Sequence, residues 1–298
     1  MIPLFTSIPP TLSRKSPNGI EIGQQYLATC IDSWRASGFE PYTVNAVKEK
    51  LNDLVLGKSI NAILVDRDAG ALCGRPLVFF DDFISAVRRS ACGPVVITNA
   101  DIFLKLDRRM TEILAAIRPG ECVIAKRTDV VDPQQLHGEL YEYGYDFFCF
   151  HTSDLGGVEF KDLVFGQPWW DHCLPLRVLL AGAVPLSFPG SFAYHLVHSE
   201  RWDPENWRKF GSSYVNNIRR GFERADFQGV GQTRFHDAFS AAVGYSSGSL
   251  SGRIRWAFSR LTAKARMSNT EAQLHRLASV NVAYIDSPFG RFGSRPVI

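Results

Sequence analysis

The chain has 298 residues, of which 45% are hydrophobic and 21% are charged, and its formal net charge is +3. This composition is ordinary for a globular protein that buries a sizeable core, and it excludes a predominantly disordered chain. A net charge this small gives no support for nucleic-acid binding.

The distribution of cysteines and apolar runs bears on where the protein works. The six cysteines lack the clustered spacing of zinc sites, so we expect reduced thiols. The N-terminus lacks a basic segment followed by an apolar run, which argues against a signal peptide. No apolar run reaches the about 18 residues that a membrane span needs. We therefore expect a cytoplasmic protein.

The first half of the chain alternates short apolar runs with segments of helical periodicity. The runs predict strands at residues 1–5, 41–44, 61–65, 94–98 and 122–125. Helices are predicted between them, at about 22–37, 47–56, 82–90 and 110–118. Repeated alternation of this kind predicts an α/β fold with a mostly parallel sheet and helices on both faces.

The predicted strand at 94–98 is the centre of the chain's organisation. It is a β-branched apolar run without charge, which is typical of a strand buried on both faces. It ends at two polar residues, Asn99 and Asp101. Ligands of open α/β sheets bind at the carboxyl ends of the strands. The sequence therefore predicts a binding site beside these two residues.

The second half contains a less regular set of elements. An aromatic strand is expected within 144–151, and a helix is expected from Pro168, in its first turn, towards residue 183. Asp171 would lie near the N-terminus of that helix, where the helix dipole favours an ionised carboxylate. A last strand is predicted at 184–188. A polar cluster containing His195 and His198 follows it.

The remaining third of the chain has mainly helical periodicity. Residues 1–205 would form the catalytic domain, and residues 206–298 a helical extension with a flexible tail. Within that extension, residues 253–266 predict a basic amphipathic helix. Such a helix either rests on an anionic membrane surface or is an ordinary surface helix with a solvated basic face. The first alternative would place the protein peripherally at the inner face of the membrane.

Three motifs, taken in order, resemble landmarks of the nucleotide-sugar glycosyltransferases with the GT-A fold. They are Asn99-Ala100-Asp101, Trp169-Trp170-Asp171 and the stretch from His195 to His198. The tryptophan motif and the histidine stretch also resemble uncharacterised bacterial proteins of this fold that are associated with surface polysaccharide. The resemblance covers roughly residues 1–205 and implies a GT-A-like fold.

The resemblance also implies roles for individual residues. Asp101 would ligate a divalent metal, Mn²⁺ or Mg²⁺, with His198 or His195 completing its shell. Asp171 would be the general base of an inverting transfer, and the rings of Trp169 and Trp170 would bind the acceptor. The set implied or suggested for donor binding is Thr6, Ser7, Ile8 and Pro9 of the first loop with Asn45, Asp66, Arg67, Asn99 and Asp101.

One departure from the family pattern affects the metal site. Asn99 replaces the first aspartate of the motif, so it would contact ribose or phosphate instead of metal. Each site residue also has a structural alternative, which is core packing for the tryptophans, a helix N-terminal charge for Asp171 and a satisfied structural histidine for His195 or His198.

The expected function is that of a glycosyltransferase that moves a sugar from a nucleotide-sugar to a glycan or lipid-linked acceptor. A sugar-phosphate nucleotidyltransferase is one alternative, although Ser7-Ile8-Pro9-Pro10 is not the glycine-rich first loop that such enzymes need. A non-catalytic nucleotide- or glycan-binding module of the same fold is the other. A dinucleotide-binding Rossmann domain is disfavoured because no Gly-x-Gly-x-x-Gly turn follows the first strand.

Overall fold

The computed structural model describes six ranges and five single positions of the chain. They are residues 1–16, 18–132, 135–156, 159–188, 190–198 and 203–223, and positions 278, 279, 286, 295 and 296. None of the helices in these ranges is long and apolar enough to cross a membrane. The basic helix predicted at 253–266 lies outside the described residues.

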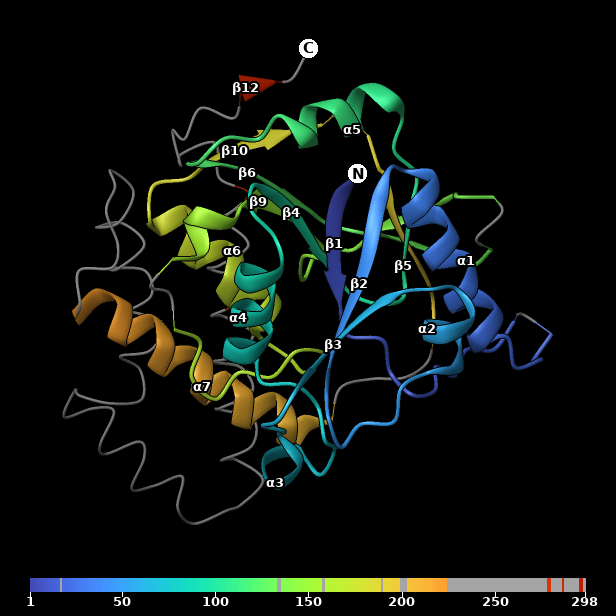
Figure 1. Ribbon diagram of the computed structural model, residues 1–298, viewed down its shortest axis with the longest axis horizontal. Coiled ribbons are helices and arrows are strands. Elements are labelled where there is room, and N and C mark those ends of the chain that lie inside the picture. Colours follow the sequence, from blue (N-terminus) through green and yellow to red (C-terminus); the bar gives the residue numbers. More distant parts are fainter. Residues whose placement is uncertain are drawn as a thin grey trace.

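The centre of the fold is an eight-stranded sheet (Figure 1). In sheet order its strands are β12 (Arg295–Pro296), β10 (Val184–Ser187), β6 (Glu121–Ala125), β9 (Phe147–His151), β4 (Pro94–Thr98), β1 (Ile2–Thr6), β2 (Phe39–Ala46) and β3 (Asn61–Val65). Strand β9 runs antiparallel to both of its neighbours, and the other pairs are parallel. The predicted mostly parallel sheet is therefore confirmed.

Helices cover both faces of this sheet (Figure 1). On one face, α1 (Gly23–Ala36), α2 (Asp53–Gly57) and α5 (Arg108–Ala115) contribute to one apolar cluster. On the other face, α4 (Phe80–Ser90), α6 (Trp170–Leu180) and α7 (Pro204–Glu223) contribute to a second cluster. Two further short elements are α3 (Gly70–Cys73) and a 3₁₀ turn (Thr152–Leu155). The predicted α/β fold with helices on both faces is confirmed.

Two predicted helix starts are wrong for local reasons. The helix expected from residue 47 begins only at Asp53, because the Asn52 side chain accepts a hydrogen bond from the Leu54 N–H and caps it there. The helix expected from Pro168 begins at Trp170, because Trp169 has a positive φ of 84° and ends the preceding turn.

A second, four-stranded sheet was not predicted from the sequence. Its strands, in sheet order, are β5 (Ile102–Leu104), β11 (Ala193–Leu196), β7 (Thr128–Val130) and β8 (Gly138–Leu140). The register of β11 places His195 opposite Ile102 on one side and Asp129 on the other. Because Asp101 directly precedes β5, this sheet brings Asp101, Asp129 and His195 together.

Helix α7 joins the main core although it crosses the predicted domain boundary between residues 205 and 206. Its apolar face buries Phe210, Tyr214 and Ile218 completely. Tyr214 stacks on Trp169, with 5.1 Å between the ring centroids. The helical structure predicted for the last third of the chain is thus confirmed for residues 204–223, and this helix packs into the core of the first 205 residues.

Candidate active site

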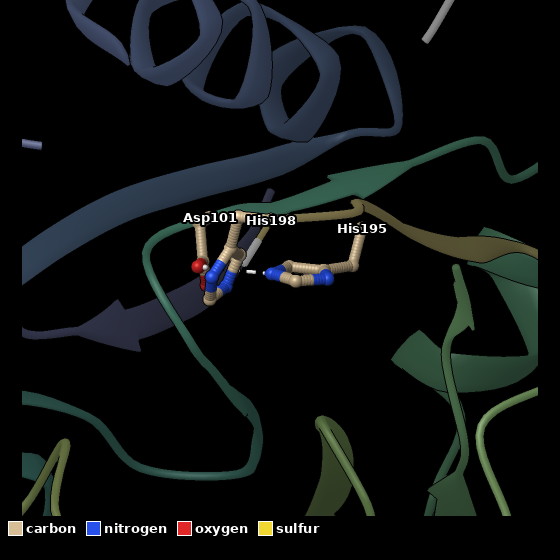
Figure 2. Close-up of side chains that lie close together, drawn as sticks. All are labelled: Asp101, His195 and His198. Carbon is tan, nitrogen blue, oxygen red and sulfur yellow. Dashed lines mark ion pairs between the residues drawn. The ribbon is translucent and has the colours of Figure 1, made fainter. Parts of the chain in front are cut away.

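The candidate metal centre consists of Asp101, His195 and His198. One ligand atom from each residue lies within 4.8 Å of the others, and Figure 2 shows the three side chains converging. The two imidazole rings meet edge to face, with 5.0 Å between their centroids. A carboxylate oxygen and two imidazole nitrogens are donors that suit first-row divalent ions such as Mn²⁺. The donor set therefore fits a metal of this class.

Secondary structure fixes the positions of these ligands. Asp101 follows the central strand β4, and His195 lies on β11 in the second sheet. The Tyr26 hydroxyl, from α1, links the two segments because it donates to the Asp101 carbonyl and accepts from the Leu196 N–H, each at 2.9 Å. Both sheets and helix α1 thus hold Asp101 and the strand of His195 in place.

The Asp101 carboxylate is surrounded by positive charge. Its Oδ2 lies 2.5 Å from an Arg14 guanidinium nitrogen and 3.3 Å from His195 Nε2. Burial alone would raise the pKa of Asp101, but His195 and Arg14 outweigh burial and hold that pKa well below its ordinary value. Asp101 is therefore an ionised carboxylate, as a metal ligand requires.

His195 lies between two carboxylates. Its Nδ1 is 3.0 Å from Asp129 Oδ1, on the side of the ring away from Asp101. Burial would lower the pKa of His195, but Asp101 and Asp129 outweigh burial and raise it. Because a carboxylate only accepts, Nδ1 carries the hydrogen towards Asp129. With its pKa raised, the ring also donates from Nε2 to Asp101. A metal bound at this position would replace the Nε2 proton, and Asp129 would keep the remaining hydrogen on Nδ1 so that the lone pair of Nε2 is directed at the metal.

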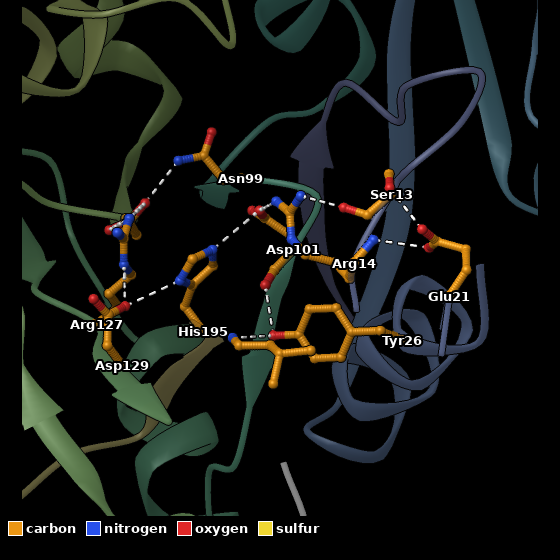
Figure 3. A network of polar contacts seen from close by, with 11 residues as sticks. Ser13, Arg14, Glu21, Tyr26, Asn99, Asp101, Arg127, Asp129 and His195 are labelled. Carbon is orange, nitrogen blue, oxygen red and sulfur yellow. Dashed lines mark hydrogen bonds and ion pairs between the residues drawn. The ribbon is translucent and has the colours of Figure 1, made fainter. Parts of the chain in front are cut away.

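A chain of charged contacts continues from His195 into the protein (Figure 3). Arg127 pairs with Asp129 at 2.7 Å and with Asp146 at 3.1 Å. The Asn99 amide nitrogen donates to Asp146 at 2.7 Å, and Asp146 is almost fully buried. The Asn99 side chain is therefore held towards this network, and its predicted contact with a donor stays a prediction.

Two of the four residues predicted to bind the donor from the first loop are buried inside the protein. Thr6 and Ile8 have no exposed surface, and neither has Asn45, whose amide donates to the Ile8 carbonyl at 3.0 Å and to Glu49 at 2.8 Å. Side chains buried to this degree cannot contact a donor, so the donor-binding prediction for these three residues is wrong. Ser7 and Pro9 are partly exposed, and their role stays a prediction.

The predicted donor residues at the end of β3 lie on the surface. Asp66 and Arg67 are exposed, and Arg67 pairs with Asp82 at 2.7 Å while its guanidinium lies 4.3 Å from the centre of the Phe79 ring. The contacts described for Arg67 connect it to α4 and not to Asp101. A donor-binding role for Asp66 and Arg67 stays a prediction.

The two tryptophans predicted to bind an acceptor are core residues. Trp169 has no exposed surface, and its indole N–H donates to the Trp207 carbonyl at 3.0 Å. Trp170 is 2% exposed and stacks on Phe165 with 4.4 Å between the centroids. Because neither ring has a face open to a sugar, the structure contradicts the acceptor-binding prediction.

Asp171 lies in the first turn of α6 and is partly buried. A Cβ atom at Gly144 would lie 3.1 Å from its Oδ2 and 3.3 Å from Tyr141 Cε1, so glycine leaves room beside the carboxylate. Burial raises the pKa of Asp171, and the nearby charge of Asp146 adds to this. The sequence suggested that the helix N-terminus would keep the pKa of Asp171 low, but burial outweighs this effect. The ionised Asp171 is therefore a stronger proton acceptor than an ordinary aspartate.

Four charged residues of the network were missed by the sequence analysis. Arg14 and Asp146 lie in connecting segments. Arg127 directly precedes β7 and Asp129 lies within it, and this strand was not predicted. Nothing in local periodicity distinguishes these residues from surface charges. The one available signal was the pair Arg127 and Asp129, since charged residues two apart on a strand share a face.

Comparisons with known proteins show only distant structural similarity. No family model and no curated protein sequence matches the chain. The solved structures similar to it include a mannosyltransferase, PcManGT from Pyrobaculum calidifontis, in complex with GDP-Man and Mn²⁺. It is 13% identical over 96% of this chain and 87% of its own, with a TM-score of 0.46.

HddC from Yersinia pseudotuberculosis is a second similar structure. It is 7% identical over 66% of this chain and 90% of its own, with a TM-score of 0.34. The complex of HddC with GMP-PN is 8% identical over 74% and 99%, with a TM-score of 0.33. Since all these TM-scores are below 0.5, the function proposed below rests on the chain's own residues.

Proposed function

We propose that this protein is a metal-dependent glycosyltransferase that takes a sugar from a nucleotide-sugar donor. The observation that carries the proposal is the convergence of Asp101, His195 and His198 at the end of the central strand of an α/β sheet. This is the sheet edge where ligands of such folds bind. A divalent ion held there would bind the diphosphate of a donor through its remaining coordination positions.

The proposed chemistry separates leaving-group stabilisation from proton removal. The metal, when bound to Asp101, His195 and His198, supplies positive charge to the departing diphosphate. Asp171 would take the proton of the acceptor hydroxyl as its oxygen forms a bond to the anomeric carbon and the bond to the diphosphate breaks. The raised pKa of Asp171 favours this role. The sugar would be transferred with inversion.

Asp171 is linked to the metal centre through charge and not through a direct contact. Its electrostatic neighbours include Asp146 and Arg127, which belong to the network that reaches His195. Tyr141 lies beside Arg127 and Asp171. The Arg127 guanidinium is 4.0 Å from the centre of its ring, and burial together with the charge of Asp171 raises the pKa of its hydroxyl. An acceptor bound beside Tyr141 and Gly144 would therefore meet Asp171 on the side that faces the network.

The donor set favours Mn²⁺ over Mg²⁺. Mg²⁺ is bound through oxygen ligands, whereas imidazole nitrogen suits first-row transition ions such as Fe²⁺, Ni²⁺ and Zn²⁺. Mn²⁺ is the first-row ion that is also suited by a carboxylate. The proposed acceptor is a glycan or a lipid-linked acceptor of surface-polysaccharide type. A sugar-phosphate nucleotidyltransferase would use the same metal but would release pyrophosphate, and a binding module would release neither product.

The experiment that tests the proposal is thermal unfolding with GDP, UDP, ADP and CDP, each with Mn²⁺, Mg²⁺, Zn²⁺ or EDTA. A ligand present at 100 times its Kd stabilises the folded state by about 2.7 kcal/mol. We expect one diphosphate to raise the unfolding midpoint with Mn²⁺ and not with EDTA. The nucleotide-sugar with the same base should then release that diphosphate during turnover.

The control variants are Asp101→Asn and Glu112→Gln. Asp101→Asn should abolish the metal-dependent rise, while Glu112→Gln removes an exposed carboxylate on α5 and should leave the rise intact. Stabilisation that is equal with metal and with EDTA would contradict the metal role of Asp101. Release of pyrophosphate from a nucleoside triphosphate would assign the nucleotidyltransferase activity instead.

A further inference from the structure

Arg14 is a buried cation on the segment between β1 and α1. Its side chain is only 7% exposed, and its guanidinium donates to the Ser13 carbonyl at 2.7 Å. The backbone around it is fixed, because the Arg14 N–H donates to Glu21 at 2.8 Å and the Ile22 N–H donates to the Arg14 carbonyl at 2.7 Å. The guanidinium is thus built into the site and is not a surface charge that happens to reach it (Figure 3).

Arg14 shares one carboxylate oxygen with the candidate metal centre. The oxygen that Arg14 approaches at 2.5 Å, Asp101 Oδ2, is the same atom that lies 3.3 Å from His195 Nε2. A divalent ion bound to this carboxylate would lie within a few ångströms of the guanidinium. The Asp101 carboxylate lies between these two cations, but its single negative charge does not balance a divalent ion and a guanidinium together. A diphosphate that also ligands the metal would supply the missing negative charge.

We propose that Arg14 binds the diphosphate of the donor and couples its binding to that of the metal at Asp101. The proposal deepens the function proposed above and rests on it. A planar guanidinium with several N–H donors matches phosphate oxygens in geometry and charge. Arg14 pairs with Asp101 when neither ligand is bound and turns its donors to the diphosphate when both are bound.

The coupling has a definite sign. Metal alone competes with Arg14 for the Asp101 carboxylate, so the charge of Arg14 weakens metal binding. Diphosphate neutralises both cations, so each ligand strengthens the other. Binding linkage requires the two enhancements to be equal, and typical couplings are about 5- to 150-fold. A substitution that removes the charge of Arg14 should strengthen binding of the metal alone and weaken binding of the nucleotide.

The experiment is isothermal titration of the full chain with Mn²⁺ alone, with the stabilising nucleoside diphosphate in EDTA, and with each ligand in the presence of the other. It compares the native protein with Arg14→Gln and Arg14→Lys. The control is Lys15→Gln, which removes the same charge from the next, exposed position. Thermal unfolding of each variant checks that it is folded.

In Arg14→Gln we expect tighter binding of Mn²⁺ alone, diphosphate binding weakened by at least about fivefold, and a coupling that falls towards unity. Arg14→Lys keeps the charge without the planar fork, so we expect it to restore the coupling in part. Lys15→Gln should behave as the native protein.

Two outcomes separate this proposal from the one on which it rests. If the native protein binds the diphosphate with Mn²⁺ and Arg14→Gln has the same coupling, the role of Arg14 is refuted and the metal centre stands. If the native protein binds neither ligand, the proposed function itself fails. If Arg14→Gln unfolds, the comparison is made between Arg14→Lys and the native protein. A coupling near unity in both proteins then refutes the role of Arg14 equally.

Discussion

The orientation of His195 by Asp129 gives a quantitative test of the candidate metal centre. Asp129→Asn replaces a charged acceptor, 3.0 Å from His195 Nδ1, with a neutral amide of the same shape. It also removes the charge that Arg127 pairs with at 2.7 Å. The Nδ1 hydrogen of the imidazole would then keep only a neutral acceptor, and Arg127 would lose one of the two carboxylates with which it pairs.

The expected loss follows from what such supporting carboxylates contribute. Loss of a carboxylate that supports a metal-bound histidine weakens metal affinity by about 10- to 100-fold. This corresponds to about 1.4 to 2.7 kcal/mol of binding free energy at 25 °C. The range agrees with the about 1.5–3 kcal/mol of a hydrogen bond to a charged group. We therefore expect Mn²⁺ affinity to fall by that factor, with the number of bound ions unchanged.

Titration with Mn²⁺, followed by calorimetry or by the electron paramagnetic signal of free Mn²⁺, measures this loss. Asp129→Ala should lose more than Asp129→Asn, because it leaves His195 Nδ1 without an acceptor. The control is Glu139→Gln, since Glu139 lies opposite Asp129 on β8 and is exposed. An affinity within about twofold of the native protein in both Asp129 variants would refute the orientation by Asp129.

Two further predictions concern stability. The pKa of Asp171 is raised in the folded protein, so the native state binds the carboxyl proton more tightly than the unfolded state does. Ionisation of Asp171 therefore destabilises the fold as the pH rises above about 4, the ordinary pKa of an aspartate. Asp171→Asn should therefore gain stability relative to the native protein between acid and neutral pH in urea unfolding, and a pH-independent difference would contradict the raised pKa. Trp169→Ala should cost about 3–5 kcal/mol, because the ring is fully buried. Tyr143→Ala, at a side chain that is 72% exposed, should cost less than about 0.5 kcal/mol, and equal losses in the two variants would contradict the core assignment of Trp169.

The central part of the fold was predictable because its signals are local. A β-branched run without charge, such as residues 94–98, has few conformations other than a buried strand. The same reasoning predicted β3, β6 and the apolar face of α7 within a few residues. The position of Asp101 at the end of the central strand follows directly from these elements. Local periodicity was therefore enough for the main sheet and for the first ligand of the candidate site.

The wrong predictions for individual site residues have a common physical cause. An aromatic or polar side chain can either contact a ligand or pack inside the protein, and the two placements are similar in energy. A Trp-Trp pair can stack on a sugar or fill a core, and only the arrival of α7 against α6 decides that Trp169 packs on Tyr214. Asn45 can contact a ligand or support a loop, and the buried carbonyl of Ile8 decides its role. These partners come from distant parts of the chain, so no local pattern contains them.

The sequence by itself determined the alternation of strands and helices, the end of the central strand at Asp101 and the histidines that follow late in the chain. The tertiary structure decided which of these residues meet. His195 and Asp129 are 66 residues apart, and Arg14 and Asp101 are 87 apart. The first contact depends on the register of the second sheet, and the second depends on the path of the segment before α1. Register and loop path depend on the packing of the whole domain, because short strands pair equally well in several alignments until side chains on both faces are buried.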